Sequence, residues 1–183
     1  MKRNFCKALP VLWFVCAVAF GDPIHAIADG AYWHHDSGWV FPEKMGEFTR
    51  VGMPQDVAGS RDAVAYYARV IEGARLVASV DVYPSDSAAS GTTLEAAKVA
   101  LERELPVGAV TPSEETLALG ADGSLRLTHV TYTTAQSVHA LYFVAKGDWR
   151  VQIKMTIPAA DLEARAALDA FVRAQRWELL TGN

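Results

Sequence analysis

The strongest structural signal in this sequence is a pair of β-type segments on either side of Gly147-Asp148. In the second segment, Trp149 to Ile157, large apolar side chains alternate with polar ones, which is the period of a strand with one buried face. In the first segment, Val138 to Lys146, apolar residues occupy both faces, which is typical of a central strand covered on both sides. Gly-Asp between two such runs favours a tight turn. The pattern therefore predicts a hairpin inside a sheet whose two faces are both packed.

Other segments add strands to this sheet. Ala63 to Ile71 and Ala74 to Tyr83 are separated by Glu72-Gly73, which is a two-residue hairpin spacing. Leu125 to Thr134 is a β-branched run that follows a possible short strand, Thr116 to Leu119, and the hairpin dipeptide Asp122-Gly123. Earlier in the chain, Glu47 to Val51 is a short candidate strand, and residues 53–62 have the composition of a loop.

In two segments, apolar residues recur at the spacing of a helix. Thr92-Thr93-Leu94-Glu95 has the form of a capping box, and a helix from Thr93 to about Leu105 is expected to end at Pro106. The second helix begins near Ala159 or Ala160 and runs to about Arg176. Its expected inner face consists of Ala164, Leu168, Phe171, Val172 and Gln175. The sequence thus predicts an α+β fold, with a mainly antiparallel sheet and two principal helices packed on it.

The N-terminus has the organisation of an export signal. Three basic residues in the first seven precede an apolar run from Ala8 to Phe20, which is shorter than the roughly 20 residues that a membrane span needs. Ala26-Ile27-Ala28 supplies small residues at the third and first positions before a cut, so residues 1–28 are predicted to be a cleaved signal peptide. A cut after Ala26 and an uncleaved N-terminal anchor are the alternatives. The chain is therefore expected to be exported, to the periplasm or beyond the cell.

Both cysteines, Cys6 and Cys16, lie in this leader, so the mature chain is expected to have neither disulfides nor thiol chemistry. Bulky residues before Cys16 argue against a lipid-modified cysteine. Of the 17 basic and 21 acidic side chains in the full sequence, 14 and 20 remain after residue 28. This acidic balance argues against nucleic acid as a partner. The remaining 155 residues, 29–183, suit a single domain with an irregular, aromatic lead-in at 29–46.

The sequence carries no motif for nucleophilic, phosphate or metal chemistry. It has no Gly-x-Ser-x-Gly element and no glycine-rich phosphate loop. His34-His35-Asp36 is the one local cluster of metal-capable groups, but adjacent residues on an extended chain point to opposite sides. We therefore predict neither a metal site nor a cofactor.

Histidines and carboxylates elsewhere are predicted to have ordinary surface or sheet roles. His129 and His139 lie on neighbouring predicted strands, where residue numbers summing to about 268 or 272 would pair, so the two could oppose each other. Acid–base catalysis needs two acids converging in a cleft. Glu114-Glu115 are expected in a loop, and Asp81 is expected to face outward from its strand.

Two groups of residues are candidates for recognition. Arg126, Arg150 and Lys154 lie on polar strand faces and could form a basic patch, although protection of the sheet is the simpler role. The lead-in aromatics could contact a ligand or partner, with packing over the core as the alternative; they are Tyr32, Trp33, Trp39 and Phe41.

Several segments together resemble a known architecture. They are Phe41-Pro42 with Gly46-x-Phe48, the hairpin end Val80-Asp81-Val82-Tyr83-Pro84, and the stretch from Leu141-Tyr142-Phe143 through Trp149 to Phe171 and Trp177. In pattern and order, over most of the mature chain, the sequence resembles small exported bacterial proteins with a PsbP/Mog1-like sandwich. That resemblance implies an accessory or assembly role without chemistry of its own, and it assigns no functional residue.

These observations favour a non-catalytic exported domain that binds a protein or envelope partner. A small-ligand carrier that uses the sheet face or the lead-in aromatics is one alternative. An enzyme such as a hydrolase, with a site assembled from distant strands, is the other, because sequence spacing does not reveal such a site.

Overall fold

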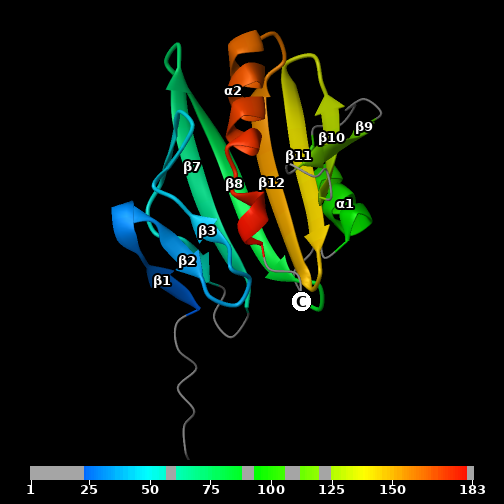
Figure 1. The fold of residues 1–183 in the computed structure, drawn as a ribbon. Coiled ribbons are helices and arrows are strands. Elements are labelled where there is room, and N and C mark those ends of the chain that lie inside the picture. Colours follow the sequence, from blue (N-terminus) through cyan, green and yellow to red (C-terminus); the bar gives the residue numbers. More distant parts are fainter. Residues whose placement is uncertain (1–22, 57–60, 88–92, 106–111, 120–124, 181–183) are drawn as a thin grey trace, which may run out of the picture.

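The two predicted hairpins form the middle of one antiparallel sheet. The computed structural model describes residues 23–56, 61–87, 93–105, 112–119 and 125–180. Nine of the described strands belong to this sheet, eight of them in the order β4-β5-β7-β8-β12-β11-β10-β9, while β6 pairs with β7. The bounds are β4 Lys44–Met45, β5 Phe48–Arg50, β6 Gln55–Asp56, β7 Ala63–Ile71, β8 Ala74–Pro84, β9 Ser113–Leu119, β10 Leu125–Thr133, β11 Ser137–Lys146 and β12 Trp149–Pro158. The α+β prediction is confirmed (Figure 1).

The predicted turn chemistry explains the two hairpins. Glu72 and Gly73, between β7 and β8, both have positive φ angles, 47° and 85°, which a right-twisted two-residue hairpin turn requires. Gly147, between β11 and β12, also has a positive φ of 53°. Glycine adopts this conformation without steric cost, so both turns form where the sequence places them.

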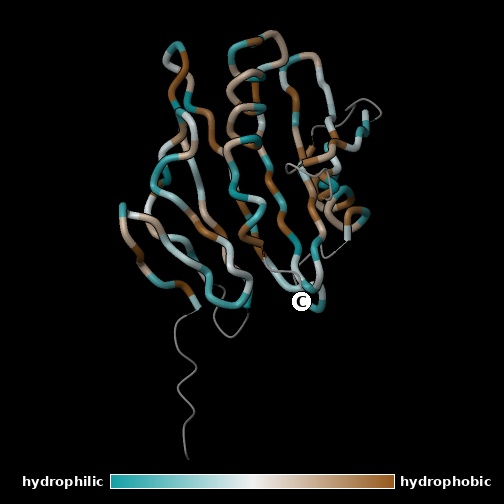
Figure 2. The backbone as a smooth tube through the Cα atoms, in the orientation of Figure 1, coloured by the Kyte–Doolittle hydropathy of each residue, from teal (hydrophilic) through white to brown (hydrophobic). Residues whose placement is uncertain are grey.

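The sheet has helices on opposite faces. Helix α2, Leu162–Arg173, packs on what we call the inner face, and α1, Leu94–Glu104, packs on the outer face. Strand β11 is buried on both faces, as predicted: Tyr142 and Val144 join the inner core, whereas Leu141 and Phe143 pack with α1. Hydrophobic residues recur along the central strands for this reason (Figure 2).

Both helices are capped by a side chain, at the predicted start for α1 and one or two residues after it for α2. The N-cap of α1 is Thr93, whose hydroxyl accepts from the Ala96 amide at 3.2 Å, and the predicted first residue of the capping box, Thr92, lies outside the described residues. The N-cap of α2 is Asp161, whose carboxylate accepts from the Ala164 amide at 2.8 Å. Each cap satisfies an amide that lacks a partner within its helix.

Helix α2 forms the centre of the inner core. Four of the five predicted inner-face residues are buried in it, together with Ala167, while the fifth, Gln175, is buried just beyond its end at Arg173. The Phe171 ring lies 4.9 Å from Phe48 and 5.3 Å from Tyr67, between centroids. Aromatic pairs at these distances add to the stabilisation from buried area. After α2, the short helix η2, Trp177–Leu179, follows the same face, and the Trp177 indole donates to the Val172 carbonyl at 3.0 Å.

The lead-in is ordered into strands, which corrects the prediction of an irregular segment at 29–46. β1 (Ile24–Ala26), β2 (Tyr32–His34) and β3 (Val40–Phe41) form a second antiparallel sheet, with η1 (Ala28–Gly30) between β1 and β2. Strands of two or three residues are too short to show an alternating pattern, which is why the sequence period did not reveal them.

Arg50 and Tyr67 tie this second sheet to the main one. The Arg50 guanidinium donates to the carbonyls of Phe41 at 2.5 Å and Gly30 at 2.6 Å, and it lies 4.5 Å from the centroid of the Tyr32 ring. The Tyr67 hydroxyl donates to the Pro42 carbonyl at 3.0 Å. The side chains of Arg50 and Tyr67 thus hold three lead-in carbonyls from the strands of the main sheet.

The register between β10 and β11 contradicts the predicted opposition of His129 and His139. Opposed residues sum to 271, so His129 lies opposite Tyr142, and His139 lies opposite Tyr132. The sequence-based sums of about 268 or 272 were therefore wrong, and the two histidines lie on opposite faces of the sheet. The turn sets this register, because the Thr134 amide donates to the Ser137 carbonyl at 2.8 Å. A shift of one residue in the register would move the side chains of a strand to the opposite face of the sheet.

The edge strand β9 is also longer than predicted. It starts at Ser113 instead of Thr116, so Glu114 and Glu115 belong to a strand and not to a loop. Acidic residues on an edge strand disfavour pairing with another chain, and they also lower the apparent strand propensity. The predicted turn at Asp122-Gly123, between β9 and β10, lies outside the described residues.

The predicted signal peptide overlaps the first described strand. β1 pairs with β2 at the edge of the small sheet, and its Ile24 is 8% exposed within the inner core. We expect a chain that begins at Asp29 to fold, but with a free energy of unfolding lower by about 1.5–3 kcal/mol than one that begins at Pro23, because one large aliphatic side chain is lost from the core. Urea unfolding of both chains measures this difference. The longer chain with Ile24→Ala is the control, and loss of a cooperative transition in the shorter chain would contradict the expectation.

His34 makes the stability of the lead-in depend on pH. Its ring is fully buried, 5.2 Å from Trp149 between centroids, and its Nδ1 lies 2.7 Å from the Ser37 hydroxyl. Burial lowers the pKa of His34 below its ordinary value, against the opposing effect of Asp36 and Asp62. The unfolded chain therefore binds more protons than the folded one just below pH 6.5, so stability is lost as the pH falls below that value.

We expect the free energy of unfolding to fall between pH 7.5 and 5.5, and His34→Gln to reduce this fall while lowering stability at pH 7.5. Burial also lowers the pKa of His139, so His139→Gln measures the second contribution of the same sign. Urea unfolding at the two pH values gives both results. An unchanged pH dependence in His34→Gln would show that His34 has no such role.

Candidate functional site

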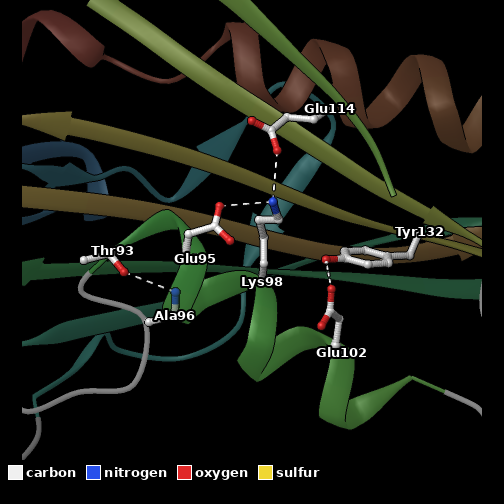
Figure 3. A network of polar contacts seen from close by, with 7 residues as sticks. All are labelled: Thr93, Glu95, Ala96, Lys98, Glu102, Glu114 and Tyr132. Atoms are coloured by element: carbon white, nitrogen blue, oxygen red, sulfur yellow. Dashed lines mark hydrogen bonds and ion pairs between the residues drawn. The ribbon is translucent and has the colours of Figure 1, made fainter. Parts of the chain in front are cut away.

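A polar network fixes α1 over one half of the outer face (Figure 3). The Lys98 ammonium lies 3.1 Å from Glu95 on the same helix and 3.1 Å from Glu114 on β9, and the two carboxylates raise the pKa of Lys98. The Tyr132 hydroxyl on β10 donates to the Glu102 carboxylate at 2.8 Å. Beneath these contacts, the apolar side of α1 packs on β10 and β11 through Ala97 and Leu101. The helix is thereby held over the β9–β11 half of the sheet.

The other half of the outer face exposes apolar side chains. Four residues on or beside β7 and β8 are 41–66% exposed. Register makes them neighbours: the Val51 amide donates to the Tyr66 carbonyl at 2.7 Å, Ala68 lies opposite Val77, and Val70 lies opposite Arg75. We call this set the outer strip; it consists of Val51, Tyr66, Val70 and Val77.

The charged side chains beside the outer strip are mostly basic. On β8 and β12 the residues that point to this face include Arg75, Arg150 and Lys154, with Asp81 as the acid among them. Asp81 lies 3.9 Å from the Lys154 ammonium and accepts from the Ser79 hydroxyl at 3.2 Å. This half of the face therefore combines an apolar strip with a basic border, in a chain whose formal net charge is −4.

Burial disfavours the ionised form of Asp81. Burial raises the pKa of its carboxyl above the ordinary value of 3.8, and the nearby Lys154 and Ser79 offset only part of that rise. The side chain is 25% exposed, so it is less solvated than the sequence-based expectation of an outward-facing surface acid. Such groups cluster at functional sites, which draws attention to this part of the face.

The three predicted basic residues share the outer face but do not form one cluster. Arg150 and Lys154 are four positions apart on β12, which is about 13 Å along a strand. Arg126 is exposed on β10, in the half of the face over which α1 lies. Arg150 donates to the carbonyls of Gly147 and Trp149, both at 2.8 Å. The structure therefore places Lys154 and Arg150 with the uncovered half and separates Arg126 from them.

The predicted lead-in aromatics divide into buried and half-buried residues. Trp39 and Phe41 are 1% and 0% exposed, and the Trp39 ring lies 5.4 Å from Trp177 between centroids. Their burial favours the packing interpretation over contact with a partner. Trp33 is half-buried, and its ring lies 5.1 Å from His35 and 6.4 Å from His25. Of the four lead-in aromatics named as recognition candidates, Tyr32 and Trp33 are half-buried, while Trp39 and Phe41 are buried.

A second cluster on the inner face contains acid–base groups that sequence reasoning separated. Glu115 on β9 lies 2.8 Å from His129 Nδ1, and the imidazole stacks on Tyr142 at 4.0 Å, with 4° between the ring planes. The Tyr142 hydroxyl donates to Asp169 of α2 at 3.3 Å. The sequence missed this cluster because Glu115 was expected in a loop and His129 was expected to oppose His139.

This inner cluster is poorly arranged for nucleophilic catalysis. A carboxylate on Nδ1 orients an imidazole as in acid–base dyads, but the stacked hydroxyl partner is Tyr142. Burial raises the pKa of Tyr142 above its ordinary value, and Asp169 raises it further, so the hydroxyl stays protonated. The neighbouring hollow measures about 100 Å³. We interpret the cluster as a structural link between β9, β10 and α2.

Metal ligation gains no support from the described part of the chain. His35 Nδ1 lies 3.1 Å from Asp36, and no group of three or more histidine, aspartate or glutamate side chains among the described residues is placed to hold an ion. His34 of the same tripeptide faces the core, as alternation on an extended chain requires.

An open hollow of about 510 Å³ lies beside the small sheet. Its lining includes Val40, Pro42, Lys44 and Arg176, together with Ile27 and Ala28. The last two residues belong to the predicted signal peptide, so cleavage after Ala28 would widen this hollow. Its lining mixes apolar side chains with charges of both signs.

Comparisons of sequence give no relative from which a function could be transferred. No protein-family model matches the chain, and no curated protein matches it. Within the described residues, neither helix is long and apolar enough to cross a bilayer.

Asp81 provides a test of the cost of a partly buried charge on the outer face. Its raised pKa means that the folded state binds more protons than the unfolded state just above pH 3.8, so ionisation reduces stability as the pH rises through this range. We expect Asp81→Asn to raise the free energy of unfolding at pH 7, and the difference to shrink at pH 3.5. Chemical denaturation at the two pH values measures it. Lower stability of Asp81→Asn at pH 7 would mean that the contact with Lys154 outweighs the cost of burial.

Proposed function

We propose that this chain is an exported, non-catalytic domain that binds a protein partner through the outer strip. The observation that carries the proposal is the exposure of Val51, Tyr66, Val70 and Val77 as neighbours on one sheet face. Scattered apolar residues are normal on a protein surface, but contiguous ones bordered by polar groups mark interaction sites. Export rests on the leader at residues 1–28, and the accessory role agrees with the PsbP/Mog1-like resemblance.

The composition of the strip fits a protein interface. Tyrosine and arginine are enriched among residues that dominate binding energy, and here Tyr66 and Arg75 lie within and beside the strip. Val70 is 66% exposed although it lies in a nine-residue strand. A partner that covers it would remove apolar surface from water without any rearrangement of the sheet.

The proposal predicts that charge within the strip abolishes binding. We expect the double variant Val70→Asp, Val77→Asp to lose capture of the partner from an envelope fraction and to weaken binding of the purified partner by about 30-fold or more, as for residues at the centre of an interface. Both side chains are exposed, so folding should be unaffected. The tagged mature chain, cross-linking and mass spectrometry identify the partner, and titration measures its affinity.

The matched control is Val99→Asp, because Val99 is 45% exposed on α1, away from the outer strip. It should capture the same partner as the unmodified chain. Undiminished capture by the strip variant would reject this surface as the binding site. A ligand that co-purifies with the chain in place of a protein partner would instead favour the carrier alternative.

A further inference from the structure

We infer that the partner presents a single acidic amphipathic helix, which packs across β7 and β8 on the uncovered half of the outer face. This inference rests on the proposed function and specifies the chemistry of the partner at the same surface. It follows from the width of the outer strip, from the way in which α1 covers the other half of the same face, and from the charges at the border.

The dimensions of the strip suit one helix. It extends from Val51, beside β5, across β7 to Val77 on β8, and neighbouring strands are about 4.8 Å apart, so the strip is about 10 Å wide. An α-helix with its side chains is about 10 Å across. A flat interface with a second copy of this chain would need about 800 Å² from each subunit, contributed by some 20–30 residues. Four exposed apolar side chains are too few for such a dimer.

Helix α1 shows how this face is covered elsewhere. It buries Ala97 and Leu101, one helical turn apart, on apolar side chains of β10 and β11, with Leu94 and Leu105 at its margins. Its polar contacts lie at the border, where Lys98 reaches Glu114. A partner helix on β7 and β8 would repeat this arrangement, with apolar residues at every third or fourth position facing the strip.

The border charges select an acidic helix. Arg75 on β8 lies opposite Val70 on β7, and Lys154 on β12 lies opposite Ser79 on β8. Arg150 lies farther along β12, opposite Tyr83 and four positions from Lys154, and Asp81 on β8 lies 3.9 Å from the Lys154 ammonium. Asp and Glu at the flanks of a partner helix would meet these cations, while basic flanks would be repelled.

The test uses the absence of cysteine after residue 28. A benzophenone maleimide attached at Val70→Cys labels whatever lies on the strip in an envelope fraction, and the same label at Val99→Cys is the matched control. Peptide mapping of the cross-linked product identifies the contacting segment. We expect the Val70 label to reach a helical segment of another protein with apolar residues three and four apart and an excess of Asp and Glu.

Charge reversal at the border of the strip tests the acidic character of the partner helix. We expect Arg75→Glu with Lys154→Glu to weaken binding of the identified partner at least tenfold and to remove most of its salt dependence. Arg126→Glu, on the half of the face beside α1, is the control and should leave binding unchanged. Equal affinity for the double charge reversal would overturn the acidic character of the helix.

The outcomes separate this inference from the function on which it rests. A cross-link from Val70 to an extended or irregular segment of another protein would overturn the helix and leave the proposed function standing. A cross-link to a second copy of this chain would also overturn the helix, since the occupant is then a homodimer. A partner that is retained without any Val70 cross-link would overturn both, because binding would then occur elsewhere.

Discussion

The width of the main sheet is the constraint on which the rest of this structure depends. Eight strands side by side are about 34 Å across, whereas a helix covers about 10 Å. The described chain has two α-helices, so neither face can be covered by helices alone. On the inner face, the lead-in sheet and η2 join α2 in one continuous core. On the outer face, α1 has no such companion among the described segments, and apolar side chains of β7 and β8 stay in contact with water.

The two faces of the sheet also differ in the partners of their charged and polar side chains. On the inner face, Arg50 and Tyr67 donate to lead-in carbonyls, and Arg69 pairs with both Glu47 and Glu163, so charges there join neighbouring layers. On the outer face, Asp81 is partly desolvated, and its partners are the Lys154 ammonium at 3.9 Å and the Ser79 hydroxyl at 3.2 Å. A fold selected for stability alone would replace such a carboxylate. Under the proposed function, this carboxylate belongs to a surface whose role in binding offsets its cost in stability.

Long alternating segments were predictable from the sequence, and short or irregular ones were not. The strands around Glu72-Gly73 and Gly147-Asp148 and the inner face of α2 follow from period and turn chemistry alone. β2 and β3 are too short to carry a period, and the pairing of His129 depends on a hydrogen bond in one turn. The outer strip left a signal that was present but not used: β7 is apolar on both faces, like β11, although only β11 has a helix on each side.

The contact between Trp39 and Trp177 joins the beginning of the described chain to its end. A chain that emerges from a ribosome or an export channel appears N-terminus first, so Trp39 is available long before the residue against which it packs. Until then the lead-in strands lack one wall of their core, and their apolar side chains remain accessible to other molecules. Contacts of such large sequence separation slow folding. The order of synthesis and the order of packing are therefore opposed in this domain, and its last helical turn closes the layer that its first strands begin.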